Sequence, residues 1–136
     1  MNRYGVVAVN AVHSMLSGEE VHPLIAWKKA AAEAFGEGTW AQRKGCPKNA
    51  FLGLCEEGLV QGIKPGSYAE RSTSQKNKNY AVKAVQILRD KPELVDDKLG
   101  LWREVMNGVE KSHNYQMDVV LSLWNNNLIV GNYTCK

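Results

Sequence analysis

The stretch FLGLCEEGLV at residues 51–60 matches VLSLWNNNLI at residues 120–129, and this pair of segments decides the fold. Each segment carries apolar residues three and four positions apart, followed by a polar turn and two aliphatic residues. That spacing places the apolar side chains on one face of a helix, and the turn ends the helix. The chain therefore contains two similar helix-and-turn units, each with an apolar face to cover.

Further matches occur in the same order. YGVVAVN at residues 4–10 matches YAVKAVQ at residues 80–86, and Trp27 matches Trp102. Blocks that recur in a fixed order indicate duplication of one supersecondary unit. We predict an all-α fold in which two three-helix repeats pack about a pseudo-twofold axis, with no significant sheet. The expected single domain comprises repeat 1 (2–63), a connector (64–78) and repeat 2 (79–131). The alternative is that short apolar helices resemble each other by chance.

Capping residues and glycines set the expected helix limits. In the first half we expect helices over residues 3–17, over residues 23–35 and from Pro47 to the stop at Gly58. In the second half we expect helices over residues 80–88, after Asp90 as far as residue 106, and over residues 117–124. Thr39 and Gln42 have capping-box spacing, which predicts one extra turn in the first repeat. Asp90 and Glu93 also have capping-box spacing, which predicts one continuous helix after Asp90.

The composition is that of an ordinary globular domain. Of 136 residues, 44% are hydrophobic and 23% are charged, with a formal net charge of +3. This excludes disordered and fibrous classes, and the charge is too small to require nucleic acid or an acidic membrane. Three cysteines, an odd number, favour reduced thiols, and no apolar run has the length of a membrane span. We expect a cytoplasmic protein without membrane contact.

The segment at residues 37–48 is the first candidate site, because it contains the main insertion that distinguishes the first repeat from the second. Free backbone N–H groups and cations at the start of a helix favour anions. The candidate ligand-binding or anion-binding residues are Trp40, Gln42, Arg43, Lys44 and Lys48. The alternative, which residue statistics favour, is that Trp40 covers the end of the core while the cations stay solvated.

Basic residues gather in two loops, at residues 40–48 and 64–78. If both loops share a face, they form a small basic patch suited to weak nucleic-acid binding. The connector candidates are Lys64, Arg71, Lys76 and Lys78. The alternative is that these cations serve solubility. A helix-turn-helix is disfavoured because the segments after the two turns are too short to be recognition helices.

Cys46 is a weak candidate for a catalytic residue. It precedes Pro47 at a predicted helix start, where nearby cations would stabilise a thiolate. No spacing brings His13, His22 or His113 to it as a general base. No other catalytic residue is indicated, and no Cys or His pair has the spacing of a metal site. We expect no metal and no cofactor.

Other notable side chains are expected to be structural. Cys55 falls on the apolar face of its predicted helix and should lie in the core. Trp27 and Trp102 should be core anchors. Residues 56–57 and 96–97 are two pairs of adjacent carboxylates, which diverge around a helix, so we expect them to face solvent.

The run GCPKNAFLGLCEEGLV at residues 45–60, together with NYQMDVVL at residues 114–121, resembles a small uncharacterised bacterial protein family of unknown function. The resemblance covers most of the chain. It implies a bacterial, soluble protein, and it supplies no activity, cofactor or catalytic residue.

Three functional hypotheses follow from the sequence. A non-enzymatic helical interaction or regulatory module is favoured, because the helical scaffold lacks convergent catalytic groups; its partner would be another protein or a second copy of the chain. Weak nucleic-acid binding through loops 40–48 and 64–78 comes second. A thiol-dependent protein that uses Cys46 comes third.

Overall fold

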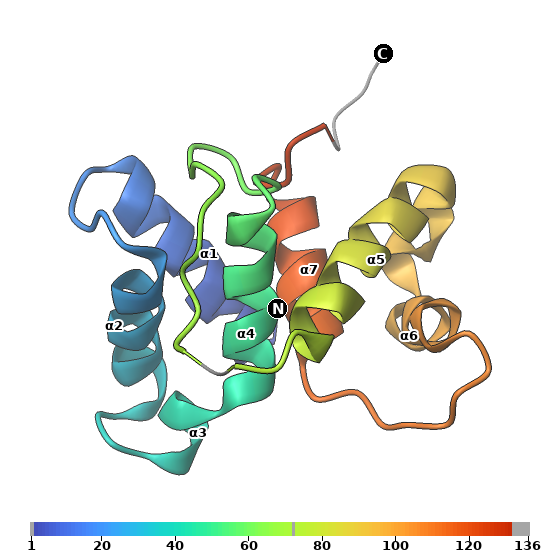
Figure 1. The fold of residues 1–136 in the computed structure, drawn as a ribbon, viewed down its shortest axis with the longest axis horizontal. Coiled ribbons are helices and arrows are strands. Elements are labelled where there is room, and N and C mark those ends of the chain that lie inside the picture. Colours follow the sequence, from blue (N-terminus) through green and yellow to red (C-terminus); the bar gives the residue numbers. More distant parts are fainter. Residues whose placement is uncertain (1, 72, 132–136) are drawn as a thin grey trace.

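The computed structural model describes residues 2–71 and 73–131, and this part of the chain is helical (Figure 1). Its elements are α1 (Arg3–Leu16), α2 (Pro23–Phe35), α3 (Trp40–Arg43), α4 (Gly45–Glu56), α5 (Lys76–Asp90), the 3₁₀ helix η1 (Pro92–Asp96), α6 (Lys98–Met106) and α7 (Gln116–Asn125). Strand-like pairing among the described residues is limited to one isolated bridge between Val60 and Ile129. The predicted all-α class is confirmed.

The first two helices begin where the sequence predicted, at Arg3 and Pro23. The Asn2 Oδ1 atom accepts a hydrogen bond from the Tyr4 backbone N–H at 2.8 Å and so caps α1. His22 caps α2, because its Nδ1 accepts from the Leu24 N–H at 3.1 Å. Pro23 follows at the first helical position, where the missing N–H leaves no hydrogen bond unmade. Local sequence alone therefore positions these two helices.

The predicted extra turn is α3. Thr39 caps it, since its Oγ1 accepts from the Gln42 N–H at 3.2 Å. The next helix, α4, starts at Gly45, two residues before the predicted start at Pro47. Pro47 still lies within the first turn, where backbone N–H groups have no partner inside the helix.

The single helix predicted after Asp90 is wrong, because two shorter elements replace it. Asp90 is the last residue of α5 rather than a cap. Pro92 opens η1, and α6 then begins anew with Asp97, whose Oδ1 accepts from the Gly100 N–H at 2.9 Å. An aspartate that bonds the backbone in this way favours a new helix start over continuation of the old helix. Asp97 is thus a helix cap rather than only a solvated charge.

The segment between α4 and α5 runs back along α4 (Figure 1). Near the carboxyl-terminal end of α4, the Gly66 N–H donates to the Glu56 carbonyl at 3.2 Å. Near the amino-terminal end, the Glu70 carboxylate pairs with Lys48 Nζ at 2.8 Å. The next helix, α5, begins at Lys76, before the predicted end of the connector at residue 78. Because the connector returns in this way, α4 and α5 begin at the same end of the molecule.

The helices α4 and α7 end in the same kind of turn. A residue with left-handed backbone follows each helix, Gly58 with φ 72° and Asn127 with φ 58°. The next residues, Leu59 and Leu128, donate backbone hydrogen bonds to carbonyls five positions earlier, at 3.0 and 2.9 Å. This is the Schellman geometry that closes a helix and turns the chain back over its end. The stop predicted at Gly58 is confirmed.

The two turned-back segments pair with each other. The Val130 N–H donates to the Leu59 carbonyl, and the Gln61 N–H donates to the Leu128 carbonyl, each at 2.8 Å. We call these four residues the clasp. The clasp joins the carboxyl-terminal ends of α4 and α7, so the two helices run in the same direction and both begin at the opposite end of the molecule (Figure 1).

Small residues allow neighbouring helices to approach closely. A Cβ atom added to Gly53 would overlap the side chain of Lys78, so α4 packs directly against the first turn of α5. A Cβ atom added to Gly5 would overlap the side chain of Ser122, so the first turn of α1 packs against α7. These contacts bring the early turns of α1 and α5 alongside α7 and α4.

The core is built on the predicted aromatic anchors. Trp27 is 0% exposed and Trp102 is 6% exposed. The Trp27 ring lies 5.2 Å from the Phe51 ring, measured between centroids. Cys55 is fully buried in the same core, as predicted. Both tryptophans and Cys55 are therefore structural.

Glu56 corrects the expectation that the paired carboxylates face solvent. Its side chain is 8% exposed. Its Oε2 accepts backbone hydrogen bonds from Tyr68 at 2.7 Å and from Ala69 at 2.9 Å, and its Oε1 pairs with Lys78 Nζ at 3.0 Å. Burial acts to raise the pKa of Glu56, but the two N–H donors and the lysine outweigh burial, so the pKa lies below its ordinary value. The carboxylate fastens the connector to α4.

Replacing Glu56 with Gln should lower the free energy of unfolding by about 2 kcal/mol, because two N–H donors and an ammonium lose an ionised acceptor. Because folding lowers the pKa of Glu56, its stabilisation is present above the ordinary glutamate pKa and is lost as the pH falls. Wild-type stability should therefore decline more steeply in acid than that of the variant.

Urea unfolding across the acid range measures this difference. The matched control is Glu57→Gln, which should cost less than about 1 kcal/mol, because this carboxylate is half exposed and its one ion pair among the described residues is with Lys78. Equal losses in the two variants would contradict the role given to Glu56.

Candidate ligand-binding site

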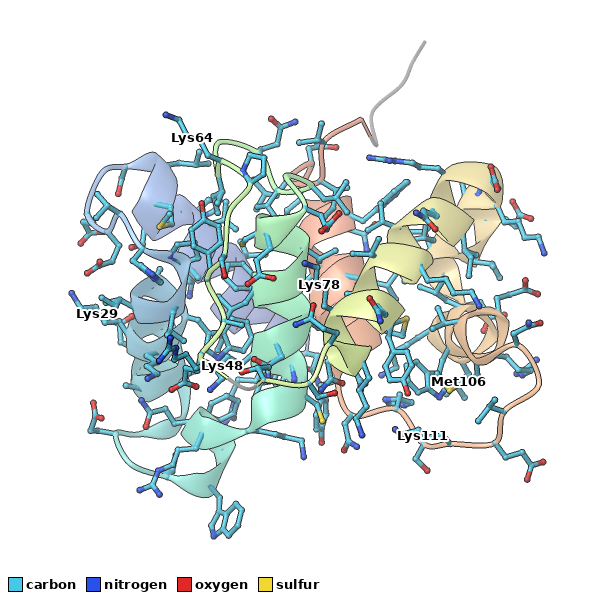
Figure 2. All side chains as sticks on the ribbon, viewed as in Figure 1. Lys29, Lys48, Lys64, Lys78, Met106 and Lys111 are labelled. Carbon is cyan, nitrogen blue, oxygen red and sulfur yellow. The ribbon has the colours of Figure 1, made fainter. Side chains whose placement is uncertain are left out.

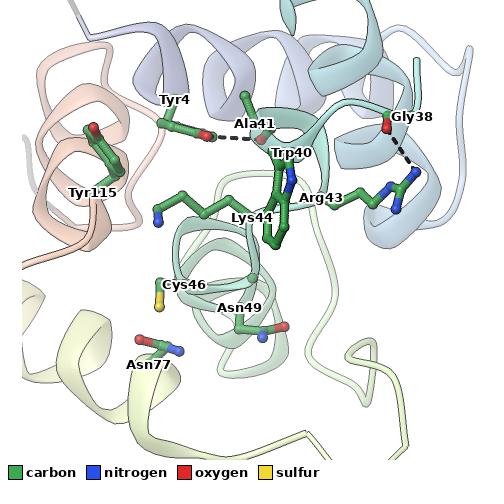
Figure 3. A pocket seen from close by; sticks show the side chains of 11 residues that line it. Tyr4, Gly38, Trp40, Ala41, Arg43, Lys44, Cys46, Asn49, Asn77 and Tyr115 are labelled. Carbon is green, nitrogen blue, oxygen red and sulfur yellow. Dashed lines mark hydrogen bonds between the residues drawn. The ribbon is translucent and has the colours of Figure 1, made fainter. Parts of the chain in front are cut away.

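A pocket opens at the end of the molecule where α4, α5 and α7 begin (Figure 3). Its volume is about 870 Å³, within the range of small-molecule sites. The residues that line it are Tyr4, Gly38, Trp40, Ala41, Arg43, Lys44, Gly45, Cys46, Asn49, Asn77 and Tyr115.

Part of the pocket wall comes from first helical turns. Tyr4 lies in the first turn of α1, Cys46 in the first turn of α4 and Asn77 in the first turn of α5, while Tyr115 directly precedes α7. The first N–H groups of a helix have no partner inside the helix, and the helix dipole makes that end positive. The pocket is therefore surrounded by positive helix ends.

The helices that contribute to the pocket differ in their caps, since α1 and α3 are capped by Asn2 and Thr39. The helices α2 and α6, which begin elsewhere, have caps whose side chains accept backbone hydrogen bonds. The residues that precede α4, α5 and α7 are Lys44, Gln75 and Tyr115, and none of them makes such a bond. At the start of α5, however, Ser74 Oγ accepts from the Lys76 N–H at 3.3 Å, so among the described residues the starts without a side-chain acceptor are those of α4 and α7.

The charged groups at the pocket are cationic. Arg43 and Lys44 line it, and none of the described residues that line it is acidic. Arg43 Nη2 donates to the Gly38 carbonyl at 2.8 Å, and Lys44 Nζ lies 5.8 Å from the centroid of the Tyr115 ring. Neither cation has an ion pair with a carboxylate among residues 2–71 and 73–131. Lys44 extends toward Tyr115 over the pocket, whereas Arg43 reaches toward Gly38, away from Cys46 and Asn77 (Figure 3).

Aromatic rings form one side of the pocket. The Tyr4 ring lies 4.8 Å from the Tyr115 ring, between centroids, and its hydroxyl donates to the Ala41 carbonyl at 2.9 Å. Burial, with a smaller effect from Tyr115, raises the pKa of Tyr4, so the hydroxyl stays protonated as a donor. Tyr4 thus attaches α3 to α1 and holds the inserted turn beside the pocket.

Trp40 differs from the favoured expectation. It was expected to cover the end of the core, but it is 93% exposed. The turn that carries it is held by other groups: Tyr4 bonds Ala41, and Gln42 Nε2 donates to the Lys28 carbonyl at 3.2 Å. The indole is therefore free to project at the pocket (Figure 3).

Two amide side chains complete the wall. Asn77 is 6% exposed, and its Oδ1 accepts from Gln116 Nε2 at 3.0 Å. Asn49 lies one turn into α4, and its Oδ1 is buried without a hydrogen-bond partner in the described structure. Sequence reasoning missed both residues, together with Tyr4 and Tyr115, because they reach the pocket from four separate segments.

The predicted ligand residues are only partly brought together. Trp40, Arg43 and Lys44 line the pocket. Gln42 instead accepts from the Gly38 N–H at 2.7 Å through Oε1 and supports the α3 turn. Lys48 lies outside the pocket and pairs with Glu70. The cationic character of the pocket therefore rests on Arg43 and Lys44.

The predicted nucleic-acid residues do not all lie together. Lys78 pairs with Glu56 and also with Glu57 at 3.1 Å, which neutralises its charge. Lys64 lies at the opposite end of α4 from Lys48 (Figure 2). Arg71 and Lys76 are exposed on the connector and at the start of α5. Nucleic-acid binding through loops 40–48 and 64–78 stays a prediction, with Glu56, Glu57 and Glu70 beside some of its cations.

Cys46 lies in the pocket wall and is a free thiol. No histidine is among the residues that line the pocket. His113 instead packs against Trp102, with ring centroids 6.2 Å apart, and His22 caps α2. Cys55 is completely buried, and burial together with the nearby Glu56 charge raises the pKa of its thiol. The two thiols therefore differ sharply in accessibility.

Comparison with known proteins places the chain in a family. The model for a family of unknown function, DUF6979, matches residues 1–130, and the chain belongs to that family. No curated protein and no solved structure matches the chain. Over the described residues, every helix is too short or too polar to span a bilayer.

Alkylation of the native protein by iodoacetamide should modify Cys46 well before Cys55, because Cys55 is buried and its thiolate is disfavoured. Mass spectrometry of the peptides measures each site, and Cys46→Ser is the control. Equal labelling of both thiols in folded protein would contradict the burial of Cys55.

Proposed function

We propose that this protein is a non-enzymatic binding module that takes a small anion into the pocket at the starts of α4, α5 and α7. The observation that carries the proposal is the coincidence of these helix starts with Arg43 and Lys44 around one cavity, where the starts of α4 and α7 have no side-chain cap among the described residues. Free N–H donors and unpaired cations are the groups that bind phosphate, sulfate and carboxylate.

The lining residues favour binding over catalysis. Acid–base chemistry needs a histidine or carboxylate within hydrogen-bond reach of a substrate, and no described lining residue is of either type. Cys46 is available as a thiol, but no base accompanies it in the wall. A pocket that binds without reacting fits a regulatory module, which changes its interactions when a ligand is present. We therefore retain the hypothesis favoured from the sequence, a non-enzymatic interaction or regulatory module, and specify that it binds a small anion.

We further propose that the protein acts in the cytoplasm. Cys46 and Cys55 are free thiols, a state that a reducing compartment maintains. The proposed ligand is a small anion such as one that carries phosphate. Anions of this kind are abundant in the cytoplasm, so the proposed ligand and the proposed compartment agree.

Pyrophosphate should bind the protein at low ionic strength, and Lys44→Gln should weaken binding about tenfold, the effect of losing one charge-assisted contact. Arg43→Gln should act in the same direction. Isothermal titration calorimetry measures the affinities, which should fall as salt is added.

The matched control is Lys64→Gln, which removes the same charge at the opposite end of α4 (Figure 2) and should leave the affinity unchanged. Equal weakening by Lys64→Gln would show that net charge, not the pocket, attracts the anion. Absence of any binding by wild-type protein would refute the proposal.

A further inference from the structure

A buried carboxylate on α7 is only half satisfied by the fold. Asp118 is 7% exposed, and its Oδ1 accepts a hydrogen bond from Lys98 Nζ at 3.1 Å. Its Oδ2 is also buried, but it has no hydrogen-bond partner among residues 2–71 and 73–131. A buried carboxylate oxygen without a donor is unfavourable, because it has lost its hydrogen bonds to water. A donor supplied by a ligand would therefore stabilise Asp118.

Asp118 lies in the wall of a second pocket, which is formed by Asn2 at the start of α1, by η1 and by α7. The volume of this pocket is about 290 Å³, near the lower limit of small-molecule sites. The terminal torsion of an aspartate side chain is broad, so the carboxylate can turn to meet a donor in this space. The pocket therefore suits a small ligand that donates hydrogen bonds.

Neutral oxygen atoms surround the carboxylate in this wall. Ser122, Asn125 and Asn126 each contribute a hydroxyl or amide oxygen. Asn126 is held in place, because its Nδ2 donates to the Ser122 carbonyl at 2.7 Å. An ammonium group has three N–H donors and no acceptor, so it is the complement of a wall rich in acceptors.

The rest of the wall favours an alkyl chain that carries a positive charge. Val95 and Leu121 are half-buried and supply apolar surface. Asp118 is the one charged side chain among the described residues that line the pocket. Glu93 and Asp96 add negative charge on η1, the element that contributes Val95. An alkyl chain with a cationic end can cover the apolar surface and place its charge on the carboxylate.

We propose that this second pocket binds a small aliphatic amine, with its ammonium group on Asp118 and its alkyl chain against Val95 and Leu121. The ammonium donates to the carboxylate in a charge-assisted hydrogen bond, which is roughly twice as strong as a neutral one. Lys98 donates to the same carboxylate, so it competes with the ligand. Among the described residues, this pocket and the anion pocket share no lining residue, so the proposal does not depend on the proposed anion-binding function.

A titration with butylamine at low ionic strength tests the proposal, with NMR of the Asn125 and Asn126 side-chain amides and of the Asp118 backbone amide as the readout. These signals should shift and reach saturation. Butanol has the same alkyl chain without the charge, so it should bind about tenfold more weakly.

Two variants test the contact with the carboxylate. Asp118→Asn should weaken butylamine binding about tenfold, because the amide keeps the shape of the carboxylate but not its charge. Lys98→Met should strengthen binding, because it removes the competing ammonium and keeps the apolar stem. Lys98→Met decides the question alone if Asp118→Asn fails to fold. The matched control is Asp96→Asn, which removes the same charge at an exposed residue outside the pocket and should leave the affinity unchanged.

Equal binding of butylamine and butanol would overturn the proposal, and so would an unchanged affinity in Asp118→Asn or in Lys98→Met. If Asp96→Asn weakened binding as much as Asp118→Asn, the charge of the surface rather than the buried carboxylate would be the attraction, and the site would be refuted. A blocked lysine tripeptide that bound more tightly than butylamine would overturn the assignment to a small amine, because the pocket would then take the side chain of a protein partner.

Discussion

The clasp fastens the carboxyl-terminal ends of α4 and α7 to each other through the paired backbones of Leu59 with Val130 and Gln61 with Leu128. Two helices joined at those ends must run side by side in the same direction, so their dipoles repel and their unpaired N–H groups are concentrated together. The returning connector places the start of α5 at the same location. An anion at that location relieves the repulsion and satisfies donors that these chain segments leave free, which is how the fold leads to the proposed site.

Much of the fold could be predicted because its determinants are local. The caps Asn2, His22 and Thr39 each act on a residue two or three positions away, and Gly58 ends its helix through its own backbone geometry. The break after Asp90 was missed because Asp90 and Asp97 can both cap a helix, and the structure uses Asp97. Such choices are decided by tertiary contacts that a single segment does not contain.

The site was harder to predict. Residues 40–44 could be identified as unusual, but the pocket exists only because Asn77 and Tyr115 arrive from distant parts of the chain. The exposure of Trp40 depends on Tyr4, 36 positions earlier, which holds the inserted turn by its hydroxyl. Glu56 appeared to be one of two equivalent surface carboxylates, yet the returning connector surrounds it with donors. The predicted duplication remains a proposal. It is supported by the clasp, since exchanging each residue with the one 69 positions away converts one of its hydrogen bonds into the other.

The central claim is that the helix starts, together with Arg43 and Lys44 beside them, hold the anion, and that lysines outside the pocket do not. Backbone amide chemical shifts in a pyrophosphate titration test this most directly, because each N–H reports its own hydrogen bond. The account predicts that the largest changes occur at Gly45 and Cys46 in α4 and at the first residues of α5 and α7. The claim would be contradicted if the largest changes occurred at Lys64 and Arg71 instead, with the amides of Gly45 and Cys46 unaffected.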